Sequence, residues 1–306
     1  MAVIDTGLSL PGARSEFFKI FDNADKTAHY TEWATLVNST KDGEKYRWLG
    51  SVPPMQEWGT GREAKPLYKE SFDVLAMKYA LTLEVDRDEI ADDQTGQIMM
   101  RVREMAQRAA QHKDSLIATL LANGDQAGFL AYDGKVYFAT DHESGESGVQ
   151  SNKLTPAAVD PAAPTVAEFK TALGSGIEAL LELKDDSGEP AASSASGLVA
   201  VVPPGMFVTS MEALGATLIS STTNVLAGAA KLVAFPRLTD ASKWFVLKTD
   251  VAIRPFIFQD REPIEFTALE QQSETGFLRE VFLYGVRARY RIAYGAWQHA
   301  LQLDFV

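Results

Sequence analysis

The residues best suited to chemistry are Asp141, His142 and Glu143, which stand side by side in the sequence. Carboxylates and an imidazole can bind a divalent metal, but such a site needs three or four ligands that converge in space. The chain has four histidines, and no two of them have the spacing of a helical ligand pair: His29, His112, His142 and His299. We therefore interpret His142 as a solvent-exposed turn residue and expect no metal and no cofactor.

Other motifs match catalytic or phosphate-binding sites only in part. GTGREAK at 59–65 lacks the G-x-x-x-x-G-K-S/T spacing of a phosphate-binding loop, and GESGV at 145–149 lacks the G-x-S-x-G spacing of a nucleophile elbow. Acidic residues before a helical pattern favour the helix dipole, which accounts for a run of four: Asp86, Asp88, Asp92 and Asp93. The chain has no cysteine, so a thiol nucleophile is excluded. We expect a protein that is not an enzyme.

The most distinctive basic feature is the alternating set Arg287, Arg289 and Arg291. Side chains alternate sides along a strand, so these arginines share one face. The opposite face is then apolar: Val286, Ala288, Tyr290 and Ile292. Two interpretations stay open. The arginines either form a solvated strand face, or they make ion pairs with another subunit or contact a DNA backbone.

Composition limits the possible classes of protein. The 306 residues are 46% hydrophobic and 23% charged, which predicts one large folded domain or two closely joined ones. The formal net charge of −12 opposes strong binding to nucleic acid, so any contact with DNA should be weak or local. No signal peptide is visible, and no apolar stretch approaches the roughly 18 residues of a membrane span. We expect a soluble protein that stays where it is made.

The first half of the chain predicts two helices and a hairpin. Aromatic residues at helical spacing predict a helix over 14–37 that needs another surface to bury against. Residues 46–58 and 67–85 read as the two strands of a long hairpin with a polar tip at 59–65. The clearest helix spans 93–123, with Asp92 or Asp93 as its cap, Gly124 at its end and Lys113 interrupting its apolar face.

The second half mixes strands and one more helix. Short strands and polar loop are expected over 129–155, a connector over 156–164, and a helix over 165–183. A loop should follow over 185–197. Strands are then predicted at four places, the last of them alternating: 198–204, 231–238, 243–249 and from 277 onward. The mixture of segregated helices and strands indicates an α+β fold.

Several segments resemble the major head subunit family of Mu-like phages, in family order and across most of the chain. They are YRWLG at 46–50, PMQEW at 54–58, VDRDEIADDQTGQ at 85–97, YDGKVYFATDH at 132–142, SN at 151–152, IRPFIFQDRE at 253–262 and FLREVFLYGVRARYRIAYGAWQ at 277–298. The residues before Tyr46 and the region 156–250 match more loosely.

The resemblance implies the HK97-type major capsid fold. In its terms the chain divides into an N-terminal arm, an extended hairpin loop, a peripheral domain in two parts and an axial domain. The expected boundaries are 1–45 for the arm, 46–85 for the hairpin loop, 86–164 and 251–306 for the peripheral domain with a spine helix at 93–123, and 165–250 for the axial domain. An arm that starts close to Met1 argues against a long removed segment before it.

The resemblance also implies a structural function, self-assembly into the icosahedral shell around a phage genome. Expected partners are copies of the chain in hexamers and pentamers, scaffolding, portal and decoration proteins, and packaged double-stranded DNA in weak contact, with no membrane. The expected location is the virion, after assembly in the host cytoplasm. Candidate contacts at the hairpin tip are Glu57, Trp58, Arg62, Lys65 and Lys69. No motif identifies residues for a covalent crosslink.

Two alternatives remain open at this point. A nanocompartment shell of the encapsulin type would have the same fold and hold enzymes instead of a genome. An unrelated α+β hydrolase would instead need a constellation of acid, base and nucleophile, and the motifs above do not provide one.

Overall fold

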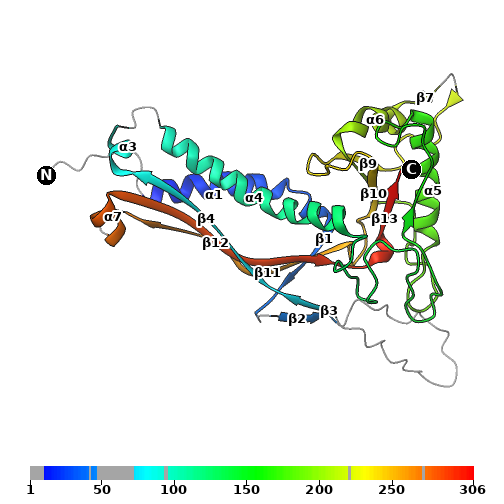
Figure 1. Cartoon of the computed structure of the whole chain (residues 1–306), viewed down its shortest axis with the longest axis horizontal. Helices are drawn as coiled ribbons and strands as arrows, with labels where there is room; N and C mark the ends of the chain where they lie inside the picture. Colours follow the sequence, from blue (N-terminus) through cyan, green and yellow to red (C-terminus); the bar gives the residue numbers. More distant parts are fainter. Residues whose placement is uncertain (1–9, 41–42, 47–71, 93–95, 220–221, 271–272) are drawn as a thin grey trace.

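The computed structural model describes residues 10–40, 43–46, 72–92, 96–219, 222–270 and 273–306. These residues form a long arm of strands and helices that joins a compact part at one end (Figure 1). The arm holds α1, α4 and the long strands β4, β11 and β12, and the compact part holds α5, α6 and the strands around β10.

A four-stranded sheet runs along the arm in the order β1-β11-β12-β4. Its strands are β1 (Ala34–Asn38), β4 (Met77–Asp86), β11 (Phe256–Leu269) and β12 (Val281–Tyr294). β1 pairs with β11 in parallel, and the other two pairings are antiparallel. The predicted alternation in β12 is confirmed, because its even-numbered residues from Val286 to Ile292 are buried while Arg287 is exposed. The short helix α7 (Glu274–Arg279) precedes β12, where the sequence predicted strand from 277 onward.

Helix α4 (Gln97–Asn123) packs on the apolar face of this sheet and confirms the predicted long helix. Its start differs from the prediction. Asp92 ends a separate short helix, α3 (Arg87–Asp92), and Asp93 lies outside the described residues. The N-cap is Gly96, whose φ of 71° lies in the left-handed region that glycine adopts without strain. Gly124 is the C-cap, as predicted, and a side chain there would meet the Phe138 ring.

The single helix predicted over 14–37 is wrong. The chain instead forms α1 (Leu10–Lys26), α2 (Tyr30–Trp33) and then strand β1. Asp114 of α4 explains the break, because its carboxylate accepts hydrogen bonds from the backbone N–H groups of His29 and Tyr30. The surface that the aromatic residues needed is supplied by the same chain, since Phe17 packs with Phe266 of the long sheet.

The compact part is built on a five-stranded sheet in the order β5-β13-β10-β6-β9. Its strands are β5 (Lys153–Leu154), β6 (Leu198–Val202), β9 (Lys231–Ala234), β10 (Lys243–Lys248) and β13 (Ala300–Asp304). β6 and β10 are buried throughout. One face packs against α5 (Val166–Glu182) and α6 (Phe207–Gly215), and the other joins the core shared with the long sheet.

Several predictions for this part are confirmed, with shorter elements than expected. α5 begins at a capping box between Thr165 and Glu168, and β6, β9 and β10 lie within their predicted ranges. Elements that the sequence did not predict are α6, two 3-10 turns and a small hairpin: η1 (Pro204–Met206), η2 (Trp297–His299), β7 (Leu218–Ile219) and β8 (Thr222–Thr223). No helix among the described residues is long and apolar enough to cross a membrane.

The final strand β13 belongs to the compact sheet, where it pairs with β10 and β5. The expected second part of the peripheral domain, 251–306, therefore does not lie in one sheet, because β11 and β12 belong to the long sheet. At the base of the predicted hairpin, β2 (Gly43–Tyr46) pairs with β3 (Phe72–Leu75) in antiparallel register. The hairpin tip lies outside the described residues.

Candidate functional site

The arginine face of β12 is the first candidate site, and the structure brings its members onto one side of the long sheet. Arg287 and Arg289 both reach the carboxylate of Glu262 on β11, at nitrogen–oxygen distances of 2.7 and 2.8 Å. The hydrogen bond from Arg289 lowers the pKa of Glu262, and the charge of Arg287 adds to this effect. Two of the three arginines are thus paired within the chain.

The surroundings of this face carry both signs of charge. In the sheet register Glu265 lies opposite Arg287, and Lys78 of β4 lies opposite Arg289. Arg291 turns toward the edge of the sheet and contacts the Met77 sulfur. Arg287 is the more exposed of the paired arginines, at 44%, and an exposed guanidinium group can form further ion pairs and hydrogen bonds with carboxylates or phosphates.

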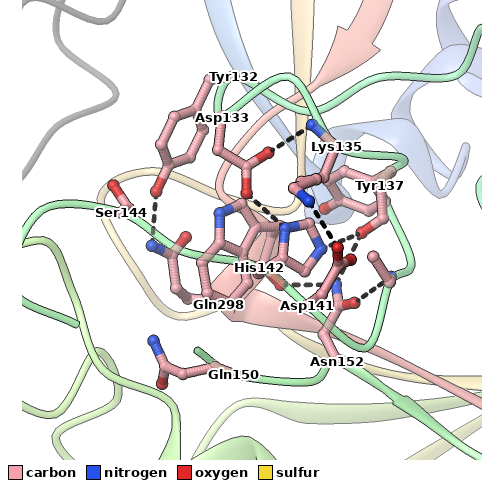
Figure 2. A network of polar contacts seen from close by, with 12 residues as sticks. Tyr132, Asp133, Lys135, Tyr137, Asp141, His142, Ser144, Gln150, Asn152 and Gln298 are labelled. Carbon is pink, nitrogen blue, oxygen red and sulfur yellow. Dashed lines mark hydrogen bonds and ion pairs between the residues drawn. The ribbon is translucent and has the colours of Figure 1, made fainter. Parts of the chain in front are cut away.

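His142 lies in a second candidate site, and its predicted exposure is wrong. The side chain is fully buried, and its ring stacks on Trp297 at 4.1 Å between centroids. Its Nδ1 lies 2.6 Å from the carboxylate of Asp133, and its Nε2 faces the Tyr137 carbonyl oxygen (Figure 2). Asp133 is nine residues away, so adjacency in sequence pointed to the wrong acids. Both ring nitrogens are engaged within the fold, which leaves neither for a substrate.

The same network fixes the loop that precedes β5 (Figure 2). Asn152 accepts a hydrogen bond from the Ala139 N–H at 2.9 Å and donates to the carbonyl oxygens of Tyr137 and Trp297. Gln298 donates to the Tyr132 hydroxyl at 2.6 Å. These side chains come from three of the segments quoted in the sequence comparison, 132–142, 151–152 and 277–298. They hold the loop in one conformation and do not form a catalytic centre.

Where the structure describes them, the remaining predicted motifs do not assemble a site. Asp141 pairs with Lys135 at the surface, apart from the His142 pair. Among the described residues, no group of three or more histidine and acidic side chains could hold a metal ion. The five candidate contacts of the hairpin tip lie outside the described residues: Glu57, Trp58, Arg62, Lys65 and Lys69.

Sequence reasoning missed a buried charged site at Lys113. This lysine does not interrupt the buried face of α4 but lies within it, with its ammonium group 2.7 Å from Asp25 of α1. It also donates to the Tyr30 hydroxyl and lies over the Tyr30 ring at 4.4 Å. Burial and the bond to Asp25 raise the pKa of Tyr30. A lysine at an apolar helix position was the signal that could have revealed this site.

A second missed site is Asp125, just beyond the end of α4. Its carboxylate accepts hydrogen bonds from Lys153, Lys243 and Gln302. Burial alone would raise the pKa of Asp125, but these donors outweigh it and lower the pKa to about 2. The three donors come from β5, β10 and β13, so one carboxylate ties the long helix to the compact sheet.

The chain matches the family model described as Mu-like prophage major head subunit gpT over residues 10–163 and 239–304. A Mu-like prophage FluMu major head subunit of Haemophilus influenzae is 25% identical over 278 residues, covering 90% of this chain and 66% of the relative. The major capsid protein of Escherichia phage Mu is 28% identical over 142 residues, covering 46% of each. The chain thus spans less than two thirds of the length of these relatives.

Solved structures show the same fold. A procapsid chain of bacteriophage JBD30 aligns with a TM-score of 0.56 at 23% identity, over 96% of this chain and 74% of that one. A mature capsid chain of bacteriophage PhiM1 aligns with a TM-score of 0.61 at 10% identity, over 92% of this chain and 87% of that one. A chain of a virus-like particle from Pyrococcus furiosus aligns with a TM-score of 0.59 at 9% identity, over 96% of this chain and 98% of that one. These likenesses confirm the predicted α+β architecture of the HK97 type.

Proposed function

This chain belongs to the family of Mu-like prophage major head subunits, and from this we propose that it is a major capsid protein that self-assembles into the icosahedral shell of a phage head. The observation that carries the proposal is the family match over residues 10–163 and 239–304, which include α1, α4, the long sheet and the C-terminal strand β13. A shell subunit needs extended contact surfaces and no catalytic centre, and the paired charges of the β12 face fit that need.

Within this function the long arm corresponds to the peripheral domain and the compact part to the axial domain. α4 is then the spine helix, and α1 with α2 forms the N-terminal arm. By sheet membership, residues 153–154 and 300–304 join the axial unit, which revises the boundaries expected from the sequence.

The contacts of the subunit follow from the same proposal. The hairpin tip reaches a neighbouring copy, and the β12 arginine face meets a neighbouring copy or packaged DNA. Further partners are hexamers and pentamers of the chain, with scaffolding, portal and decoration proteins. Contact with double-stranded DNA is weak, because the chain carries a net charge of −12. Assembly takes place in the host cytoplasm and the product resides in the virion.

Electron microscopy of the expressed chain, alone and with the neighbouring genes of its operon, tests the function. Closed icosahedral particles are the expected result, and a monodisperse monomer under all conditions would contradict it. A nanocompartment shell is the second candidate, because it would have the same fold. Particles that contain nuclease-resistant DNA support the phage head, whereas particles filled with one enzyme support the nanocompartment.

A further inference from the structure

Strand β4 is the exposed edge of the long sheet. Among the described residues it pairs with β12 on one side and has no strand on the other. It is ten residues long, and only Val85 is buried. An uncovered edge of this length exposes a row of backbone hydrogen-bonding groups, which proteins usually cover or pair.

A groove runs beside this edge, between β4 and the helix α4. Two cavities of about 360 Å³ each line it, and they share Leu81 and Arg108. The first extends along Tyr79 and Ala80, and the second along Thr82 and Leu83. Leu81 itself is 37% exposed and lines both cavities. The groove therefore has room for apolar side chains of an added strand.

Charges along β4 are arranged with opposite signs at its two ends. Lys78 lies near the start and Glu84 near the end, equally far from Leu81. Lys78 lies opposite Arg289 and Glu84 lies opposite Leu283 in the sheet register, so both point to the outer face. An antiparallel copy of the same strand would bring each lysine to the other copy's glutamate.

We propose that β4 pairs with β4 of a second copy, antiparallel about a twofold axis centred on Leu81. Leu81 then faces its own equivalent, and Tyr79 faces Leu83 of the second copy on the groove side. On the outer face Lys78 faces Glu84 of the second copy, twice by symmetry. Such an isologous contact is self-complementary by construction. The inference rests on the proposed shell function for the presence of neighbouring copies.

This pairing is one weak contact among several. A single strand pair buries well below the roughly 1,200 Å² of a stable binary interface, so it forms where other contacts hold the copies together. The place to test it is the assembled particle or the concentrated full-length chain.

The cysteine-free sequence permits a direct test with Leu81→Cys. Mild oxidation of the assembled variant should give disulfide-linked dimers on non-reducing gels. Linkage should be about tenfold or more faster than for Thr267→Cys, an exposed position on β11 of the same sheet, because a held pair has a high effective concentration. Equal rates for the two variants, or no dimer from Leu81→Cys in assembled particles, would overturn the pairing.

A second measurement tests the register without altering Leu81. Lys78→Cys and Glu84→Cys, both at exposed positions, should form a linked heterodimer when the two variants are assembled together. Each alone should stay unlinked, because equivalent residues would be about 20 Å apart across the axis. Self-linked dimers at the same rate as mixed ones would rule the register out. Shells without these crosslinks would refute the pairing and leave the shell function intact. Crosslinked dimers that never close into shells would support the pairing and contradict the shell function.

Discussion

At the scale of single residues, the donors around Asp125 strongly lower the pKa of its carboxyl group. Its pKa of about 2 lies below the usual value near 4 because Lys153, Lys243 and Gln302 bind the charged form. A depressed carboxyl pKa stabilises the fold above the unfolded pKa, and this stability is lost as the pH falls through the folded pKa. The relevant window therefore lies between about pH 4 and pH 2.

We predict that Asp125→Asn lowers the free energy of unfolding by about 2 kcal/mol at neutral pH, because two lysines lose their counter-charge. The difference from the unchanged chain should shrink below pH 4 and vanish near pH 2. Urea unfolding at a series of pH values measures it. Glu178→Gln is the control, since Glu178 is exposed on α5. A constant difference across the whole pH range would contradict the assignment.

Lys113 gives the second prediction at this scale. Its side chain is 11% exposed and Asp25 is 22% exposed, so Lys113→Met leaves a largely buried carboxylate without its partner. The expected loss of stability is about 2–4 kcal/mol. Adding Asp25→Asn should restore part of it, because the amide still accepts from the Tyr30 hydroxyl.

The control for this pair is Lys19→Met, because the Lys19 side chain is 69% exposed and its ion pair with Glu16, at 3.9 Å, should contribute less than about 0.5 kcal/mol. Denaturant unfolding of the unchanged chain, Lys113→Met, Asp25→Asn and the double variant measures the coupling between Lys113 and Asp25. Strictly additive effects of the two substitutions would show that the two side chains do not act as a pair.

Individual residues were the hardest feature to predict from the sequence. His142 and Lys113 were both interpreted from their neighbours in the chain, as a turn residue and as an interruption of a helix face. Their partners Asp133, Trp297 and Asp25 lie 9 to 155 positions away in the chain, and only the tertiary fold brings them together. The alternation of Arg287 and its neighbours was predictable because strand geometry alone determines it.

At the scale of elements, the hairpin tip is the segment that we expect to contact neighbouring copies. Its base, β2 with β3, is held against the long sheet by the Tyr46 hydroxyl, which donates to Gln259 at 2.7 Å. We predict that replacing Gly59 to Lys69 with a two-residue Asn-Gly turn leaves the fold intact and prevents closed shells.

Circular dichroism and thermal melting report the fold of that variant, and light scattering with electron microscopy reports its assembly. A native spectrum with a cooperative melt, together with arrest at monomers or capsomers, is the expected pair of results. Normal shells would show that the tip is dispensable, and an unfolded chain would show that the tip belongs to the core.

Elements with strong local signals were predictable. α4 and α5 follow helical periodicity, and β6 is a short apolar run that ends at prolines. Residues 14–37 were mispredicted as one helix because the break between α1 and α2 is set by Asp114, which lies more than 80 residues away in the chain. α6 was missed because its exposed side is also apolar, with Val208 and Met211 at the surface, so it lacks the amphipathic pattern.

At the scale of the whole molecule, the β12 arginine face gives a prediction about assembly. Replacing Arg287, Arg289 and Arg291 together with glutamine should weaken shells or reduce genome retention, because it removes three cations from an acidic protein. The matched control is glutamine at Lys19, Lys26 and Lys184, which changes the net charge equally at exposed positions elsewhere. Particle yield and nuclease-protected DNA are the readouts, and equal behaviour of the two triple variants would show that these arginines interact only within their own subunit and with solvent.

The architecture of the whole chain followed from the resemblance more than from periodicity. Local patterns predicted separate strands and helices, but they carry no information on which strands pair across the chain. The assignment of β13 to the compact sheet, away from β12, depends on a turn at Trp297 that no local pattern indicated.

The sheet topology also governs how the subunit emerges from the ribosome. β1 near the N-terminus pairs with β11, β4 pairs with β12, and β5 pairs with β13, so both sheets join early strands to strands beyond residue 255. Translation delivers residues from the N-terminus onward, and pairing partners this far apart close late. The nascent chain therefore cannot complete either sheet until its C-terminal strands have left the exit tunnel. A nascent chain that still lacks β12 therefore has no finished sheet edge at β4 for the proposed pairing.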